Sequence, residues 1–333
     1  MTRIRHLRYL DIGKIKKMVS YLNDEGLEIT KSLEAEILAK VQNLLPLRFN
    51  FFPESFVLTD KNKILGLITV APTSGNPYKI NITRLVFAQN MYDVGRQLVE
   101  FIIAKFGAKG AVAFSVMINE NDDELMNLFI NGCGFRQCSV EVLWRFDKSK
   151  IDTNTIKINF RKAQNNDSKQ IAALFNGELK SVYKPSLLRK KNEFKEPFFE
   201  GFSKFYKTRY VLEEPSDNRI IAYISITTSD NRNFILDICA NDGYSIDYSY
   251  IMNFAVNDIR KYKSDFSIFV KQKKYSKNSE NLEKFLQAQN ASPIQTQHVL
   301  IKDYYKSVKQ ESFVQVFSLG EKLSLTMEQY KSD

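Results

Sequence analysis

The segment from Leu85 to Phe101 has the spacing of a phosphate-binding turn. An apolar strand that ends in Leu85, Val86 and Phe87 is followed by a short polar stretch, and we expect a helix to start at or just after Gly95. The first N–H groups of a helix have no partner within it and lie at the positive end of its dipole, so they bind phosphate. A glycine permits close approach of the backbone. We therefore expect an anionic ligand over Val94, Gly95 and Arg96. The alternative is that Asp93 is simply the N-cap of the helix and Gly95 an entry-turn residue, since capping alone explains the stretch.

Other chemistry-bearing residues are scarce. The two histidines, His6 and His298, and the three cysteines, Cys133, Cys138 and Cys239, form no cluster with metal-ligand spacing. A zinc site, a Ser-His-Asp triad or a disulfide framework is therefore not indicated, and we expect no metal.

The composition is that of a globular protein. The 333 residues are 44% hydrophobic and 26% charged, which suits two domains. The apolar runs are too short to cross a membrane, and the first residues carry charges where a signal peptide is apolar, so we expect a cytoplasmic protein without a membrane partner.

The net charge of +10 has two dense basic runs, Lys184–Lys195 and Val270–Lys277. We expect both to face solvent, because they are rich in lysine and poor in aromatic residues. Nucleic-acid binding is the alternative, but it rests on charge alone and no nucleic-acid-binding motif supports it.

Alternating patterns of strand and helix must position the turn. The first half predicts a strand, a helix N-capped by Asp11, a second helix, a hairpin, and then strand, helix, strand, helix and strand. The second half repeats this order, with Asp167 in the place of Asp11. We predict an α/β fold with mixed sheets in two tandem units, residues 1–147 and 156–306, joined by a polar link and followed by a tail, residues 307–333.

This order of elements resembles the GNAT superfamily of acyl-CoA-dependent N-acyltransferases, in tandem. The stretch "VGRQLV" is similar to the end of the family's pyrophosphate-binding motif, and "MINENDDELMNLFINGCGF" to the next motif, with Asn121 near its asparagine and Gly134-Phe135 as its Gly-Phe pair. The resemblance implies acetyl-CoA or another acyl-CoA as co-substrate. It also implies a splayed strand end, from Arg84 to Phe87, that holds the pantetheine arm, and so a cofactor site at Leu85, Val86, Phe87, Val94, Gly95, Arg96 and Asn121.

Several positions depart from the family pattern. Asn90 replaces an Arg or Gln, and Asp93 replaces the first glycine, where its charge opposes a pyrophosphate. Phe129 stands where many members have the tyrosine that protonates the leaving thiolate, and it cannot donate a proton. One extra residue also separates Phe129 from the Gly-Phe pair. Tyr92 is a replacement acid, and Glu120, Glu54 and Glu141 are candidate bases.

The second unit departs further. Its corresponding loop carries Asp242 and Asp247 around Gly243 and no cation, so we expect no CoA there. The resemblance implies an N-acyltransferase that moves an acyl group directly to the amine of a small molecule or peptide. The alternative is a catalytically inactive GNAT-like protein that binds CoA or a protein partner. The sequence does not indicate the acceptor or the oligomeric state.

Overall fold

The computed structural model describes residues 2–19, 23–42, 52–87, 92–150, 160–196, 206–228, 230–244 and 246–304. In that part of the chain, no helix is long and apolar enough to cross a membrane. The first half contains β1 (Thr2–His6), α1 (Ile12–Met18), α2 (Asn23–Gln42), β2 (Glu54–Asp60), β3 (Lys63–Thr73), β4 (Asn76–Phe87), α3 (Tyr92–Ala108), β5 (Ala113–Asn119), α4 (Asp123–Asn127) and β6 (Arg136–Phe146).

The second half repeats this order with a shorter first strand and a shorter second helix before its hairpin. It contains β7 (Arg161–Lys162), α5 (Ser168–Glu178), α6 (Lys184–Leu187), β8 (Lys207–Glu213), β9 (Ile220–Thr227), β10 (Asn233–Ala240), α7 (Tyr248–Tyr262), β11 (Ser267–Lys273), α8 (Ser279–Ala288) and β12 (Ser292–Asp303). A 3₁₀ turn, Lys191–Phe194, follows α6.

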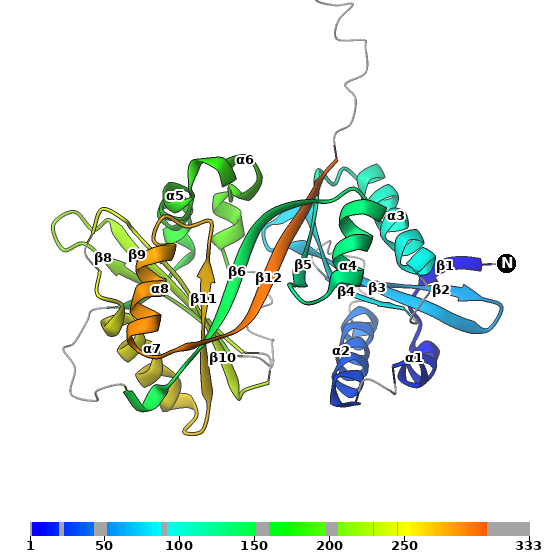
Figure 1. Cartoon of the computed structure of the whole chain (residues 1–333), viewed down its shortest axis with the longest axis horizontal. Helices are drawn as coiled ribbons and strands as arrows, with labels where there is room; N and C mark the ends of the chain where they lie inside the picture. Colours follow the sequence, from blue (N-terminus) through cyan, green and yellow to red (C-terminus); the bar gives the residue numbers. More distant parts are fainter. Residues whose placement is uncertain are drawn as a thin grey trace, which may run out of the picture. The chain divides into compact units, whose positions relative to one another are not determined.

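All twelve strands form one sheet, and their order is β1-β2-β3-β4-β5-β12-β6-β11-β10-β9-β8-β7. The order has the symmetry of an internal repeat, because each strand of the first half has its counterpart at the mirrored position. The last strands are exchanged, however, since β12 lies beside β5 and β6 lies beside β11 (Figure 1). The tandem repeat is confirmed, but the exchange was not predicted.

Strand β6 contributes to the core of the second half. It pairs antiparallel with β11, from Phe146 with Ile268 to Glu141 with Lys273. The side chains of Val142, Trp144 and Phe146 pack in one cluster with apolar residues of β10 and α7. The predicted boundaries at residues 147 and 156 stay predictions. The two halves are not separate sheets, because β6 lies beside β11 of the second half and β12 lies beside β5 of the first. Residues 151–159 and the predicted tail lie outside the described residues.

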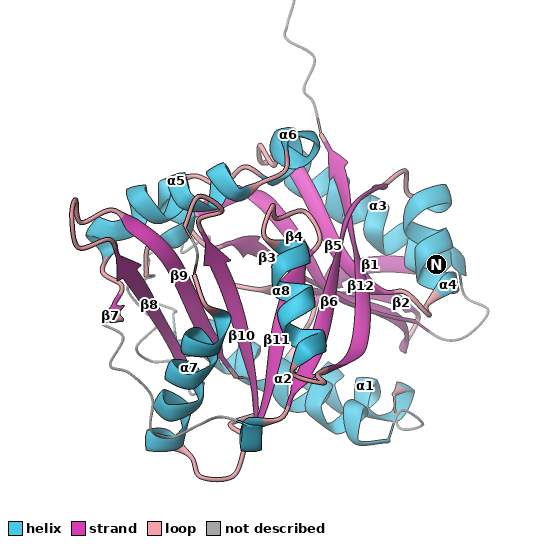
Figure 2. Ribbon diagram, turned by 60° about the vertical axis from the view of Figure 1, so that its left-hand side comes forward, coloured by secondary structure: helices cyan, strands magenta, loops and turns pink. Residues whose placement is uncertain are grey.

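Helices cover both faces of the sheet in each half. In the first half, Phe56 of β2 packs edge-on against Phe101 of α3, whereas the neighbouring Val57 joins Ile15 and Leu33 on the face of α1 and α2. In the second half, Ile238 and Ala240 of β10 likewise pack with α7, whereas Cys239 between them packs with α5. Figure 2 shows β10 between these two helices. This alternation follows from the two-residue period of a strand. One face of each half is covered by α3 or α7, and the other face by α1 or α5.

The repeat extends to side-chain contacts at the start of each half. Arg5 donates two hydrogen bonds to Asp11, and Arg161 donates two to Asp167. The prediction that Asp11 caps α1 with its side chain is wrong. Its carboxylate instead accepts from the N–H of Arg8, three residues earlier, because the salt bridge to Arg5 turns it back toward β1.

Candidate functional site

Strands β4 and β5 separate at the end of the sheet that leads to the predicted turn. They pair in parallel from Lys79 with Ala113 to Ile82 with Val116, and then part, although β4 runs on to Phe87. The register between β3 and β4 shifts by one at Thr83, and such a bulge bends a strand. From residue 84 to residue 87, β4 is paired on one edge with β3, and no described strand pairs with its other edge. Its backbone N–H and C=O groups on that edge face the gap.

Helix α3 begins at Tyr92, three residues before the predicted start at Gly95. The N–H groups without a partner inside the helix are those of its first turn, from Tyr92 to Val94. Val94 therefore belongs to the first turn, whose N–H groups are free, whereas Gly95 and Arg96 lie just beyond that turn. Asn90, which precedes the helix, lies outside the described residues.

Gly95 is buried and allows close packing of three elements. A Cβ atom at this position would lie 2.9 Å from Leu128 Cδ2 and 2.9 Å from Phe87 Cε1. Helix α3 therefore rests directly on the end of β4 and on the segment after α4. This contact sets the position of the first turn of α3 against the gap, so Gly95 has a packing role in the structure whether or not a ligand binds.

Two charged residues of the first turns of α3 face solvent. The Arg96 guanidinium donates to Glu100 Oε1 at 2.8 Å, and both side chains are 51% exposed. This hydrogen bond raises the pKa of Arg96 above its ordinary value. The exposed Asp93 stabilises the helix as an acidic residue in the first turn. An anion at this turn meets the charge of Asp93, while Arg96 is held one turn along by Glu100.

Phe129, at the position of the family's acid, is a core residue, whereas the hydroxyl of Tyr92 lies near the turn. Phe129 is 1% exposed and packs edge-on against Phe135, so it is a core aromatic residue. The half-buried Tyr92 reaches across from the first turn of α3 to the segment after α4, where its hydroxyl lies 3.5 Å from the carbonyl of Asn127. It also lies directly over Gly132, at which a Cβ atom would meet the hydroxyl at 2.3 Å. Tyr92 is thus the phenol next to the turn.

The extra residue before the Gly-Phe pair forms a π-helical turn, Leu128–Gly132, that continues α4. The chain then ends the helix at Gly134, which has a φ of +69°, and Phe135 N–H donates to Phe129 O at 2.9 Å. A left-handed glycine followed by such a backward hydrogen bond is a common helix end. The insertion is therefore absorbed within the helix, and it leaves the Gly-Phe pair at the start of β6.

Glu120 and Asn121 lie in the exposed turn between β5 and α4. The Glu120 N–H donates to Thr296 O of β12 at 2.9 Å. Next to it, Asn119 Oδ1 accepts from the side chains of Gln295 and Gln297. Strand β12 therefore lines the β5 side of the gap. The carboxylate of Glu120 and the amide of Asn121 have no described partner in the gap.

A polar network that the sequence analysis missed lies on the α2 face, next to the opening. Glu36 of α2 accepts from Ser55 Oγ at 2.7 Å and lies 3.5 Å from the guanidinium of Arg84. Arg84 also donates to Thr69 Oγ1 at 3.3 Å and to Ser32 Oγ at 3.1 Å. Arg84 is the residue after the bulge, where the gap begins. The available signal was the presence of Ser, Thr and Arg at inward positions of otherwise apolar strands.

The sequence matches no protein-family model and no curated protein. Among solved structures, it is similar to a tandem GNAT protein from the clavulanic acid biosynthesis pathway, with 8% identity over 92% of this chain and 100% of that one and a TM-score of 0.58. A GCN5-related N-acetyltransferase from Sphaerobacter thermophilus is similar at 7% identity, over 92% and 97% of the two chains, with a TM-score of 0.58. The chain has the tandem GNAT fold.

The second GNAT unit places polar side chains of its own beside the corresponding gap, next to a cavity of about 440 Å³ that Asp242, Gly243 and Tyr248 help to line. Strands β10 and β11 pair as far as Asp237 with Lys271 and then part. Beyond that point, Asn278 Nδ2 donates to the carbonyl of Ala240 at 2.6 Å, and buried Glu178 accepts from the N–H of Asp242 at 3.0 Å and from Asn278 at 3.1 Å. Burial raises the pKa of Glu178. A carboxylate and an amide of the chain itself thus occupy the end of β10 and the loop after it.

Asp247 serves the second GNAT unit as a helix cap. Its carboxylate accepts from Ser249 N–H at 2.8 Å at the start of α7. Asp247 and Glu178 thus both accept hydrogen bonds from backbone N–H groups around this loop. The expectation that this GNAT unit binds no CoA stays a prediction, which rests on the charge of these carboxylates.

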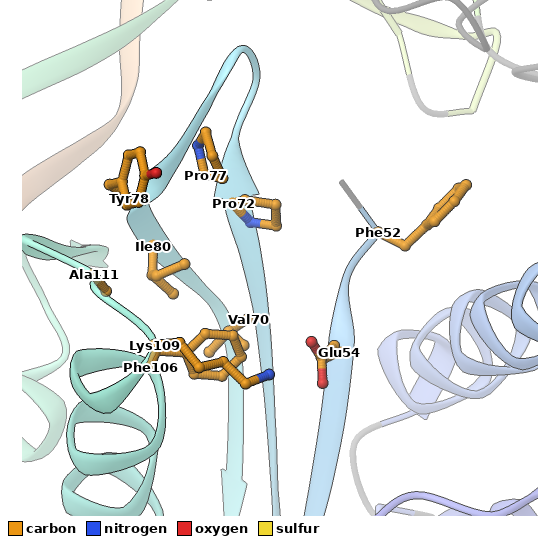
Figure 3. Close-up of a pocket in the computed structure, with 10 residues that line it drawn as sticks. All are labelled: Phe52, Glu54, Val70, Pro72, Pro77, Tyr78, Ile80, Phe106, Lys109 and Ala111. Carbon is orange, nitrogen blue, oxygen red and sulfur yellow. The ribbon is translucent and has the colours of Figure 1, made fainter. Parts of the chain in front are cut away.

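The GNAT fold also encloses a mainly apolar cavity of about 190 Å³ near the beginning of β4 (Figure 3). Phe106, Lys109 and Ala111 line it from the C-terminal end of α3 and the turn that follows, and Glu54 lies at its β2 side. The candidate base Glu54 therefore lies at the opposite end of α3 from the first turn, near His6 at 3.8 Å.

The candidate base Glu141 lies in the exchanged part of the GNAT fold. It pairs with Lys271 at 3.1 Å and accepts from the buried Tyr275 hydroxyl at 2.8 Å, both in or just after β11. It is thus a structural carboxylate of the second half. In the described part of the chain, no group of three His, Cys, Asp or Glu side chains could hold a metal ion.

The prediction that the run Val270–Lys277 faces solvent is wrong. It forms β11 near the middle of the sheet, where Lys273 is 7% exposed and Gln272 is fully buried. Its lysines are neutralised by carboxylates, Lys273 by Asp237 and Lys274 by Glu283. The strand can therefore be rich in lysine without forming a basic surface. In the other run, Lys190 and Lys191 are exposed as predicted.

Proposed function

We propose that the protein is an acyl-CoA-dependent N-acyltransferase that binds acetyl-CoA or another acyl-CoA in its first half. The contrast between the two gaps carries this proposal. In the first half, the edge of β4 from Arg84 to Phe87 has no described strand partner, whereas in the second half Asn278 donates to the carbonyl of Ala240 at the end of β10 and Glu178 accepts from the loop after it.

The pyrophosphate binds at the first turn of α3, and the pantetheine arm lies along the open edge of β4. Pantetheine carries amides that pair with a strand edge, as an added strand would. The backbone of Leu85, Val86 and Phe87 supplies the edge, and the N–H groups from Tyr92 to Val94 supply the anion site. Asp93 lowers the affinity for this anion, so we expect Asp93→Asn to bind acetyl-CoA more tightly than the wild type.

The acceptor amine enters from the α2 face, where Glu36 and Arg84 lie beside the opening. Glu36 removes a proton from the ammonium group, and the free amine then attacks the thioester carbon. An N–H on the open edge of β4 stabilises the oxyanion as the C–N bond forms. The C–S bond then breaks, Tyr92 gives its proton to the departing thiolate, and the Tyr92 phenolate takes the remaining extra proton from the new amide nitrogen. The products are an amide and CoA with a free thiol.

An inactive CoA-binding protein is the second candidate, because Phe129 replaces the usual acid with a buried ring. Binding and turnover separate the two candidates. Release of the CoA thiol from acetyl-CoA with a panel of small amines and peptide amino termini tests catalysis. Acetyl-CoA binding without amine-dependent thiol release would favour the inactive protein.

Titration calorimetry with acetyl-CoA locates the site. Gly95→Val should abolish binding, since the added methyl groups push α3 off Phe87 and Leu128. Gly243→Val is the matched control in the second half and should bind as the wild type does. Because Gly95→Val also strains the core, Asp93→Lys, an exposed change, provides a second test and should tighten binding. Wild-type protein that gives no heat with millimolar acetyl-CoA would overturn the proposal.

A further inference from the structure

The second half contains a polar cavity of about 150 Å³ on the face of α5. Its walls include Phe175 of α5, the segment from Arg189 to Lys195, and residues of β8, β9 and β10. Cys239, one residue before Ala240, points to this side of the sheet, while Ala240 packs on the α7 side. The cavity is therefore on the opposite face from the α7 core.

Arg189 is held firmly at the cavity but makes no ion pair there with a described residue. Its backbone is fixed by Asn176, which accepts from Arg189 N–H and donates to Arg189 O, both at 2.9 Å. Its guanidinium stacks over the ring of Phe175 at 4.5 Å. Among the described residues, no carboxylate lies within ion-pair distance of this guanidinium. An arginine that stacks by its face keeps the donors of its edge available for a planar acceptor.

Other charged side chains of the cavity wall have ionic partners. Asp237 is paired with Lys273, and Glu193 lies 3.9 Å from Lys79 Nζ. Arg209, with a side chain that is 8% exposed, pairs with Glu196 at 2.7 Å. Arg189, Lys195 and Lys207 add positive charge to the same wall, and the hydroxyls of Tyr223 and Ser225 line the cavity as further donors.

We propose that this cavity binds a small oxyanion, a carboxylate or a phosphate of a small molecule, through the guanidinium edge of Arg189. The volume is that of about five water molecules at ~30 Å³ each, which suits an anionic group and a few further atoms but not a nucleotide. Phe175 and Phe194 supply apolar walls for the remainder of the ligand. The proposal does not depend on acyl transfer in the first half.

The contacts around the cavity also reach the first half. The hairpin turn between β3 and β4 lies against the 3₁₀ turn of this wall, so closely that a Cβ on Gly75 would lie 1.9 Å from Asn192 O. Lys79 at the start of β4 donates to Leu188 O at 2.8 Å. An anion on Arg189 therefore binds next to the segment that supports the beginning of β4.

The test uses the full chain and four probes: inorganic phosphate, sulfate, acetate and benzoate, each compared with chloride at equal ionic strength. At least one probe should raise the melting temperature of the wild type and give a measurable Kd. Arg189→Gln should weaken that Kd by roughly tenfold or more, a loss of about 1.4 kcal/mol. Arg219→Gln, a change at an exposed arginine paired with Asp217, is the matched control and should leave the Kd unchanged.

The choice among probes identifies the ligand chemistry. Preference for phosphate and sulfate indicates a phosphorylated ligand, and preference for benzoate or acetate indicates a carboxylate; both support the proposal. Ser225→Trp, which fills the cavity without removing a charge, should also abolish binding. Acetyl-CoA binding should be unaffected by Arg189→Gln. The proposal is overturned if no probe stabilises the wild type more than chloride does, or if Arg189→Gln binds the probe equally well.

Discussion

The guanidinium of Arg161 donates two hydrogen bonds to the carboxylate of Asp167, at 2.7 and 2.9 Å. The same carboxylate accepts from Gln164 N–H at 2.7 Å, so it fixes the turn between the first strand and the first helix of the second half. These hydrogen bonds lower the pKa of Asp167, chiefly through Arg161, although burial opposes the shift. The pair thus links the ionisation of one carboxylate to the stability of this half.

Asp167→Asn should lower the free energy of unfolding by about 1–2 kcal/mol at pH 7, because water screens the partly exposed Arg161. Since the folded pKa is below the unfolded value of about 3.9, the stabilisation is present above that value and is lost as the pH falls through the folded pKa. Urea unfolding at pH 7 and pH 3 should show a smaller difference at pH 3. Asp217→Asn, at an exposed pair, should change little at either pH.

The two halves should unfold together, because β6 packs in the core of the second half. Trp144 of β6 is the only tryptophan of the chain and is 5% exposed, so its fluorescence reports on the exchanged strand. Denaturation followed by this fluorescence should coincide with that followed by far-ultraviolet circular dichroism. Two separate transitions would contradict the coupling. Gln272→Leu leaves the Trp144 N–H without its acceptor at 2.9 Å. It should lower the denaturation midpoint equally in fluorescence and in circular dichroism.

Tyr92→Phe should lower kcat by roughly 100-fold, since a general acid contributes roughly 100- to 10,000-fold. The Kd for acetyl-CoA should change little, because the hydroxyl lies beside Asn127 O and not at the first-turn N–H groups. Tyr248→Phe is the matched control, since Tyr248 begins α7 as Tyr92 begins α3. An equal loss of kcat in both variants would assign the effect to stability.

Glu36→Gln should lower kcat/KM for the amine by roughly 100-fold while acetyl-CoA binding stays the same, because the amide cannot take the ammonium proton. The loss should shrink at high pH, where the amine is already deprotonated. Glu34→Gln, an exposed change on the same helix, is the control. A loss that does not vary with pH would place Glu36 in a structural network with Ser55 and Arg84 only.

The sequence predicted the order of elements because that order depends on local patterns. The hairpin of β2 and β3, the strand before the turn and helix α3 follow from alternation and helical periodicity, and all were found. The helix start was wrong by three residues, since capping signals at Asp93 and Gly95 compete locally. The tertiary packing of Gly95 against Phe87, which no local pattern reveals, shows why the glycine stands inside the first turns.

Long-range features could not be predicted. The exchange of β6 and β12 changes neither strand's own pattern, because both remain apolar strands next to a β5-type neighbour. The buried lysines of β11 looked like surface because their carboxylate partners, Glu141 and Asp237, lie far away in the chain. The network of Glu36 and Arg84 joins a helix to a strand, and such a pair needs coordinates.

Because the last strands are exchanged, the two halves of the chain are suited to fragment complementation as separate pieces. A piece that ends at Lys150 carries β6, which belongs to its companion's sheet, and the other piece carries β12, which belongs to the first. Neither piece is a finished domain, although each encodes a nearly complete repeat. A single cut between Lys150 and Phe160 would therefore yield a two-chain heterodimer that holds together by mutual strand donation, and a duplicated ancestor that acquired this exchange could no longer lose either copy.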